Sequence, residues 1–256
     1  MIDQTAPTRE RTVPLFLAVL LPFFVLYLAT ADRSIPYHID PFTNTITAAT
    51  LGQTGSPILN DYAQLSEPGR YAVFGWVVDS PRGPVSQYPP GTALLAAPLY
   101  AMSADPGTTL DTFAYNDPEA EPVELTIPPL WPAALIGSLT SSLAVAFTAL
   151  SVRSATGSTR WALATAVVLG AGTGLWLNGA YQLWQHGPAS MWIAAALFAA
   201  SRSRWLTSGL LAGLAVLTRP PVAIISAGVG ISGSIRERSW TPVVRHGAGA
   251  LIGVIA

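Results

Sequence analysis

The chain has 256 residues, of which 50% are hydrophobic and only 11% are charged. An ordinary soluble domain carries about 25% charged residues, so this composition excludes a disordered chain, a nucleic-acid-binding protein and most soluble enzymes. The absence of cysteine excludes disulfides and thiolate chemistry. With a mean hydropathy of +0.43 and its apolar residues gathered in blocks, the sequence predicts an all-α polytopic membrane protein.

Seven apolar blocks are candidates for transmembrane helices, which need about 20 apolar residues to cross roughly 30 Å of hydrocarbon. The first block ends at Ala29-Thr30-Ala31, which also resembles a signal-peptide cleavage site, but its length of 19 residues favours a retained anchor. The last block reaches the end of the sequence, so we expect a span that is cut short there. With residues 1–12 as a cytoplasmic N-terminus, the expected spans are 13–31, 129–151, 161–178, 188–200, 206–218, 221–235 and 247–256.

The arginines predict which ends of these spans face the cytoplasm, because cytoplasmic loops are enriched in Lys and Arg. An even number of spans must then separate any two cytoplasmic clusters. The apolar stretch 88–102 therefore does not cross, and we expect an interfacial or re-entrant helix on the outer side. Residues 32–128 become one extracytoplasmic segment, which contains eleven of the fourteen acidic residues. The basic clusters are Arg9 and Arg11, Arg153 and Arg160, Arg202 and Arg204, and Arg236, Arg238 and Arg245.

Two carboxylates of the outer segment are candidates for chemistry. Asp40 precedes a helix-compatible stretch and is followed by Pro41, a sequence typical of a helix N-cap. The same carboxylate at the membrane surface is suited to take a proton from a hydroxyl, and both interpretations stay open. Asp61 follows a turn-rich stretch, where local hydrogen bonding is the alternative to a role in substrate binding.

Two groups near the outer ends of the expected spans are suited to bind an anion. His186 lies beside Trp184, and the alternative for it is a hydrogen-bonded interfacial histidine. Arg219 interrupts an apolar hairpin, where a charge is costly in lipid. It either extends to the headgroup region or binds an anion such as phosphate, which a guanidinium fork fits well. Arg82 and Arg70 are the outer-segment arginines that can take this role instead.

Four segments, taken in chain order, resemble the GT-C class of membrane glycosyltransferases. The resemblance is closest to its family-39-like branch, the protein mannosyltransferases and aminoarabinose transferases, and runs from Val13 to about Arg238. The resemblance implies that residues 13–256 are the N-terminal module of a larger enzyme. The family's Asp-Glu pair is Asp40-Pro41 here, so the second carboxylate is missing. The segments are Asp40, Tyr88-Pro-Pro-Gly-Thr-Ala-Leu-Leu-Ala-Ala-Pro-Leu-Tyr100, Leu183-Trp-Gln-His-Gly-Pro-Ala189 and Gly209-Leu-Leu-Ala-Gly-Leu-Ala-Val-Leu-Thr-Arg-Pro220.

The resemblance implies a GT-C-like transmembrane helix bundle in the plasma membrane, with a large first extracytoplasmic loop that contains interfacial helices. It implies an inverting transfer of a sugar from a polyprenyl-phosphate donor to a hydroxyl of a glycan, lipid or protein acceptor of the cell envelope. Asp40 would activate the acceptor at the outer face, and the leaving phosphate would need charge stabilisation. The substrate-binding candidates are Asp61, Tyr88, His186, Arg219 and Arg82.

The sequence indicates no resident cofactor and no metal-ligand cluster, and it leaves a divalent metal requirement open. A non-catalytic membrane protein is the alternative, with the same scaffold used to bind a lipid carrier or to assist envelope assembly.

Overall fold

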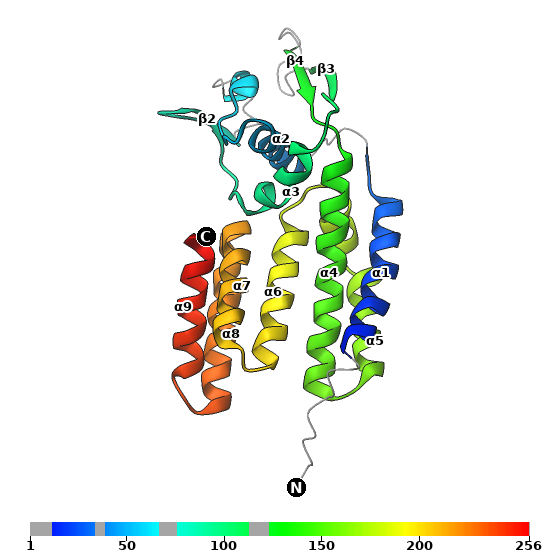
Figure 1. Cartoon of the computed structure of the whole chain (residues 1–256), viewed down its shortest axis with the longest axis vertical. Coiled ribbons are helices and arrows are strands. Elements are labelled where there is room, and N and C mark those ends of the chain that lie inside the picture. Colours follow the sequence, from blue (N-terminus) through cyan, green and yellow to red (C-terminus); the bar gives the residue numbers. More distant parts are fainter. Residues whose placement is uncertain (1–11, 34–38, 67–75, 113–122, 256) are drawn as a thin grey trace.

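The computed structural model describes residues 12–33, 39–66, 76–112 and 123–255, and this part of the chain is mostly helical. Figure 1 shows a bundle of roughly parallel and antiparallel helices with a smaller cap over one end. The bundle consists of α1 (Thr12–Thr30), α4 (Trp131–Thr156), α5 (Thr159–Gly172), the π-helical turn η4 (Trp176–Ala180), α6 (His186–Ser201), α7 (Trp205–Thr218), the 3-10 turn η5 (Pro220–Val222), α8 (Ala223–Glu237) and α9 (Thr241–Ile255). The cap consists of α2 (Ile39–Thr54), the 3-10 helix η2 (Asn60–Ser66), β1 (Val77–Ser80), β2 (Gly83–Ser86), α3 (Gly91–Ala101), β3 (Thr108–Thr112) and β4 (Val123–Ile127).

Each of the seven apolar blocks coincides with a bundle helix, with differences at some ends. Two helices of the described chain, α1 and α4, are long and apolar enough to cross a membrane. The helix α5 ends at Gly172 rather than at residue 178, because Thr173 turns to an extended backbone before the π-helical turn. The helix α9 begins at Thr241, six residues early, with Pro242 in its first turn, where the missing N–H of proline costs no hydrogen bond.

The described chain is mostly helical, as expected, and the cap adds two short antiparallel β-hairpins that were not predicted. In the first hairpin Val77 pairs with Ser86 and Ser80 with Gly83. Gly83 closes the turn with a φ of 120°, a value that side chains disfavour. In the second hairpin Thr108 pairs with Ile127. A helix within 88–102 is present as α3 (Gly91–Ala101).

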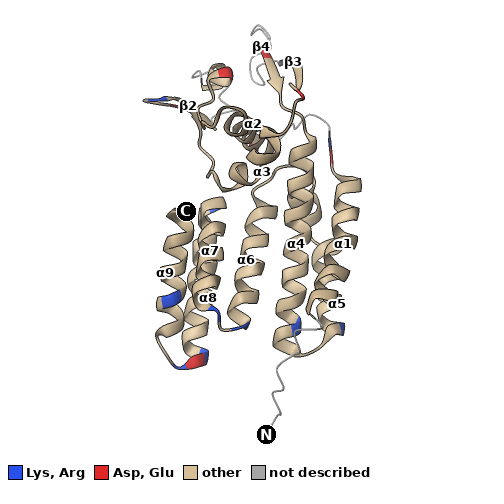
Figure 2. Cartoon of the chain, viewed as in Figure 1, with Lys and Arg blue, Asp and Glu red and all other residues tan. Residues whose placement is uncertain are grey.

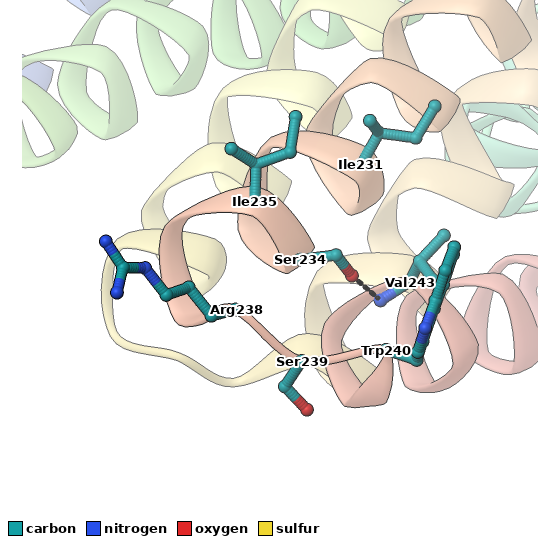
Figure 3. Close-up of a pocket in the computed structure, with 7 residues that line it drawn as sticks. All are labelled: Ile231, Ser234, Ile235, Arg238, Ser239, Trp240 and Val243. Atoms are coloured by element: carbon teal, nitrogen blue, oxygen red, sulfur yellow. Dashed lines mark hydrogen bonds between the residues drawn. The ribbon is translucent and has the colours of Figure 1, made fainter.

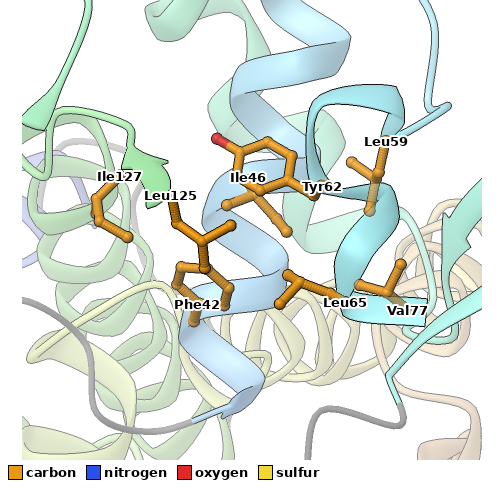
Figure 4. Close-up of a cluster of buried hydrophobic side chains, with 8 residues drawn as sticks. All are labelled: Phe42, Ile46, Leu59, Tyr62, Leu65, Val77, Leu125 and Ile127. Carbon is orange, nitrogen blue, oxygen red and sulfur yellow. The ribbon is translucent and has the colours of Figure 1, made fainter. Parts of the chain in front are cut away.

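The cap folds around a hydrophobic core of its own, shown in Figure 4. Tyr62 lies in this core, its hydroxyl donates to the carbonyl oxygen of Thr126 over 2.7 Å, and burial, with a smaller effect of Asp61, raises its pKa to about 12. Large apolar side chains thus point inward here, as they do in a protein surrounded by water. The core consists of Phe42, Ile46, Leu59, Tyr62, Leu65, Val77, Leu125 and Ile127.

The bundle helices α8 and α9 show the opposite arrangement. The buried residues of α8 are Ser226, Gly230 and Gly233, and those of α9 are Pro242, His246, Gly249 and Gly253. Their large apolar residues face outward, with Ile224 81% exposed and Leu251 68% exposed. A helix on the surface of a soluble protein has its apolar stripe facing the core, so these two helices are inverted.

Small residues bring α7 and α9 into close contact. A Cβ atom at Gly209 would lie 1.9 Å from the carbonyl oxygen of His246, and one at Gly213 would lie 2.2 Å from that of Ala250. Beside this contact, His246 Nε2 lies 3.1 Å from Ser226 Oγ. The three C-terminal helices therefore pack through backbone approach and one buried polar pair.

The charged residues separate along the bundle axis (Figure 2). Arginines occupy the end at which α4 joins α5, α6 joins α7 and α8 joins α9, whereas the cap end carries most acidic residues. Arg9 and Arg11 lie outside the described residues. The arginine clusters that were expected on one side therefore meet at one end of the bundle, which is called the arginine end below.

A substitution pair tests the α7–α9 contact. We expect Gly209→Ala to lower the free energy of unfolding by about 1–3 kcal/mol, because the added methyl group would overlap backbone of α9. The matched control is Gly247→Ala in α9, where nothing lies within 4 Å of an added Cβ, so it should be neutral or stabilise by up to about 1 kcal/mol. Unfolding in detergent measures both, and equal values for the two variants would contradict this packing.

Candidate functional site

Four of the six residues singled out in the sequence meet where the cap lies against the bundle. Asp40 comes from α2, Tyr88 from the segment before α3, His186 from the start of α6 and Arg219 from the end of α7. All four side chains are half-buried. We call them the junction cluster.

One half of the junction cluster is a hydrogen-bonded pair. The Tyr88 hydroxyl donates to Oδ1 of Asp40, which is the second residue of α2 rather than the residue that caps it. Burial raises the pKa of Tyr88, and the hydrogen bond to Asp40 and its negative charge raise it further, so the phenol stays protonated and keeps donating. The Tyr88 ring stacks on Trp76 with centroids 5.5 Å apart. No described residue donates to Asp40 Oδ2, so this oxygen has lone pairs available.

The other half pairs two groups that each can be cationic. Arg219 Nη1 lies 2.6 Å from His186 Nδ1. A guanidinium can only donate, so Nδ1 accepts and the imidazole is neutral with its proton on Nε2. Burial and the Arg219 charge lower the pKa of His186, against a smaller upward effect of Asp40. Trp184, whose ring centroid is 5.8 Å from that of His186, covers one side of the imidazole.

The start of α3 approaches the end of α7 so closely that only glycine fits. A Cβ atom at Gly91 would lie 2.6 Å from Thr218 Oγ1 and 2.8 Å from Thr218 Cα. Arg219 follows Thr218 and has an extended backbone (φ −150°, ψ 96°), as expected for a residue before proline. Pro220 then stops the helix, and the Arg219 side chain reaches His186 at the start of α6.

The loop before α6 is held by residues far away in the sequence. Asn44 Nδ2 donates to the carbonyl oxygen of Leu183 over 3.1 Å, and the backbone N–H of Asp32 donates to that of Tyr181 over 3.2 Å. Gln182 Nε2 also donates to Asp32 Oδ2, over 3.3 Å. These bonds tie α2 and the end of α1 to the loop, and they fix where α6 begins with His186.

From His186 a groove of about 380 Å³ runs down between α4, α5, η4 and α6. Its lining mixes polar residues, among them Thr148, Asn178 and Ser190, with apolar ones such as Leu169 and Leu197. Asn178 lies in the π-helical turn and was not predicted as a site residue. Such turns occur often at functional sites, but the Asn178-Gly179 pair in the sequence indicates only a turn.

The remaining candidates lie away from the junction cluster. Asp61 is exposed in η2, and Arg82 is exposed in the turn between β1 and β2. No contact of either residue with the cluster occurs in the described part of the chain, and Arg70 lies outside it. Among the described residues, no group of three or more His, Asp or Glu is placed to hold a metal ion.

A second groove, shown in Figure 3, lies between α8 and α9 at the arginine end. Its volume is about 280 Å³, and Ile231, Ile235, Trp240 and Val243 make most of its wall. Arg238 is its one charged lining residue. The groove brings no two titratable groups together and is therefore not a candidate for catalysis.

No family model matches this chain, and no curated protein or solved structure matches it either.

Two variants test the His186–Arg219 hydrogen bond, one that removes the acceptor and one that should restore it. We expect His186→Ala to lower the free energy of unfolding by about 1–2 kcal/mol, because the half-buried guanidinium loses its acceptor. In His186→Asn the side-chain oxygen lies near the position of Nδ1 and should restore at least half of the loss. Unfolding in detergent measures both, and equal losses in the two variants would show that Nδ1 is not the relevant acceptor.

The same bond predicts a pH dependence. Because the pKa of His186 is lower in the folded chain than its ordinary value of 6.5, its stabilisation is present above that pH and is lost as the pH falls below it. This contribution should be absent from His186→Asn.

Proposed function

We propose that this chain is a multi-pass membrane glycosyltransferase of the GT-C type, which transfers a sugar from a polyprenyl-phosphate donor to an acceptor hydroxyl at the outer membrane face. The observation that carries the proposal is the junction cluster. A carboxylate with an available oxygen and a guanidinium aimed by a neutral histidine meet beside a groove lined by both polar and apolar residues.

The inverted helices support the placement in a membrane. Lipid tails are as apolar as isoleucine, so helices in a bilayer gain nothing by hiding such side chains and associate through small and polar residues instead. The described bundle has this pattern in α8 and α9, and α1 likewise exposes Val13 and Val25 at more than 60%. The arginine end supports a cytoplasmic orientation of that side, with the cap and Asp40 outside.

The shorter helices are compatible with a membrane because of the residues that flank them. A helix of 14 residues, such as α7, spans about 21 Å, less than the roughly 30 Å of a typical hydrocarbon core. A short span is accommodated by thinning of the bilayer and by long basic side chains that extend to the interface. Arg204 and Arg219 flank α7 and are suited to this.

The chemistry proposed for the junction cluster divides between its halves. Asp40 takes the proton of the acceptor hydroxyl as the oxygen attacks the anomeric carbon, and the bond from that carbon to the lipid phosphate breaks with inversion. The leaving phosphate gains negative charge, which Arg219 stabilises with donors that His186 does not use. The polyprenyl chain lies in the groove, toward Leu169 and Leu197.

Pro41 is the observation that supports the alternative, a non-catalytic function. In the family that the sequence resembles, a glutamate follows the aspartate, and here the second carboxylate is replaced by a proline without charge. A lipid-carrier-binding protein would need the groove and Arg219 but no base, so the role of Asp40 distinguishes the two functions.

Asp40→Asn tests the proposal. We expect sugar transfer from a labelled polyprenyl-phosphate donor in membranes to fall at least about 100-fold, because the amide cannot accept the proton. The amide oxygen still accepts from Tyr88, so expression and stability should persist. The matched control is Asp105→Asn, an exposed residue that accepts from the backbone N–H of Gly107. Wild-type rates in Asp40→Asn would exclude the base and favour the non-catalytic alternative.

Reporter fusions test the topology. Fusions after Asn60 and after Met102 should both report the outer side, because α3 is expected to lie at the interface without crossing. A fusion after Ser203 should report the cytoplasm. A cytoplasmic signal after Met102 would mean that α3 crosses, and the orientation of all later helices would then be reversed.

A further inference from the structure

A third groove, of about 430 Å³, lies at the arginine end between the start of α7 and α9. Two guanidinium groups from different helices line it, Arg204 immediately before α7 and Arg245 in the second turn of α9. The other lining residues are Ser203, Trp205, Leu206 and Thr207, so none is acidic.

Both guanidiniums lack a counter-charge. Within the described ranges, the side chains of Arg204 and Arg245 make no hydrogen bond and no ion pair. Glu237 contacts two residues of the groove: its Oε1 accepts from Ser203 Oγ over 2.9 Å and from Trp205 Nε1 over 3.0 Å. The same oxygen lies 3.4 Å from Arg236 Nη2. Glu237 is therefore balanced by Arg236 and leaves the two groove arginines uncompensated.

The surroundings of the two guanidiniums are those of a lipid headgroup region. Arg245 lies about 6 Å along α9 from its first residue. Val244, its neighbour in the sequence, is 64% exposed, and Leu206, which lines the same groove, is 51% exposed. A cation at this depth is costly without an anionic partner. Arginine pairs with phosphate through two parallel hydrogen bonds, and Thr207, which has a hydroxyl, lines the same groove.

We propose that this groove binds the phosphate of one anionic phospholipid of the cytoplasmic leaflet. Arg204 and Arg245 hold the phosphate oxygens from two sides, and the acyl chains lie along the exposed apolar faces of α7 and α9. The inference rests on the membrane placement given under the proposed function, but it does not depend on sugar transfer.

The chain offers a control with equal charge. Arg238 lines the apolar groove of Figure 3 as its one charged residue, and Arg160 is exposed in the first turn of α5. A double variant of these two removes two charges from the same end of the bundle and leaves the proposed site intact.

The test compares lipid retention by native mass spectrometry of the full chain in neutral detergent. Mixed micelles contain phosphatidylglycerol or phosphatidylcholine with the same acyl chains. We expect the wild type to retain one phosphatidylglycerol with at least tenfold preference. The Arg204→Gln/Arg245→Gln variant should lose at least tenfold in affinity, whereas Arg160→Gln/Arg238→Gln should stay within twofold. An Arg204→Lys/Arg245→Lys variant keeps the charge and should fall between them.

Three outcomes would overturn the proposal: equal losses in both Gln variants, no preference of the wild type for phosphatidylglycerol, or displacement of the lipid by equimolar glycerol phosphate, which would show a site for free phosphate. Thermal midpoints without added lipid show whether each variant is folded, and the Lys variant provides the comparison if the Gln variant is not. Asp40→Asn should retain phosphatidylglycerol like the wild type, so failure of this site and failure of the transferase proposal are distinguishable.

Discussion

A close backbone contact between cap and bundle joins the start of α3 to the end of α7, and the junction cluster depends on it. Gly91 meets the backbone of Thr218, so a side chain on Gly91 would separate the two elements. Tyr88 lies three residues before this contact and Arg219 one residue after it. This contact therefore sets the distance between Tyr88, the partner of Asp40, and Arg219, the partner of His186.

Two packing rules occur within this one chain. The cap buries Phe, Ile, Leu and Tyr side chains, whereas α8 and α9 bury Gly, Ser, Pro and His and expose Ile, Val and Leu. The packing of the cap stabilises a fold in water because it buries apolar surface. The packing of α8 and α9 gives no such stabilisation in water. It is stable where the surroundings are themselves apolar. The junction cluster lies where the cap meets the bundle.

Much of the helical architecture was predictable because long apolar runs specify helices without tertiary information. The first hairpin was not, because Val77–Ser80 and Gly83–Ser86 show no clear alternation of apolar and polar residues. Val123–Ile127 does alternate and carried a strand signal. The candidate residues were selected one at a time, and their pairing was open. Asp40 and Tyr88 are 48 residues apart and His186 and Arg219 are 33 apart, distances at which no local pattern indicates contact. Asn178 was missed for the same reason.

The choice of histidine as the partner of Arg219 has an electrostatic consequence. A carboxylate would hold the guanidinium equally well but would cancel its charge, and an anion would then meet a neutral pair. Neutral His186 uses one N–H of Arg219 and leaves the positive charge intact. The nearby carboxylate of Asp40 accepts from Tyr88 instead, and no salt bridge joins Asp40 to Arg219 in the described chain. Arg219 is thus oriented without being neutralised, which is the state that a phosphate-binding residue requires.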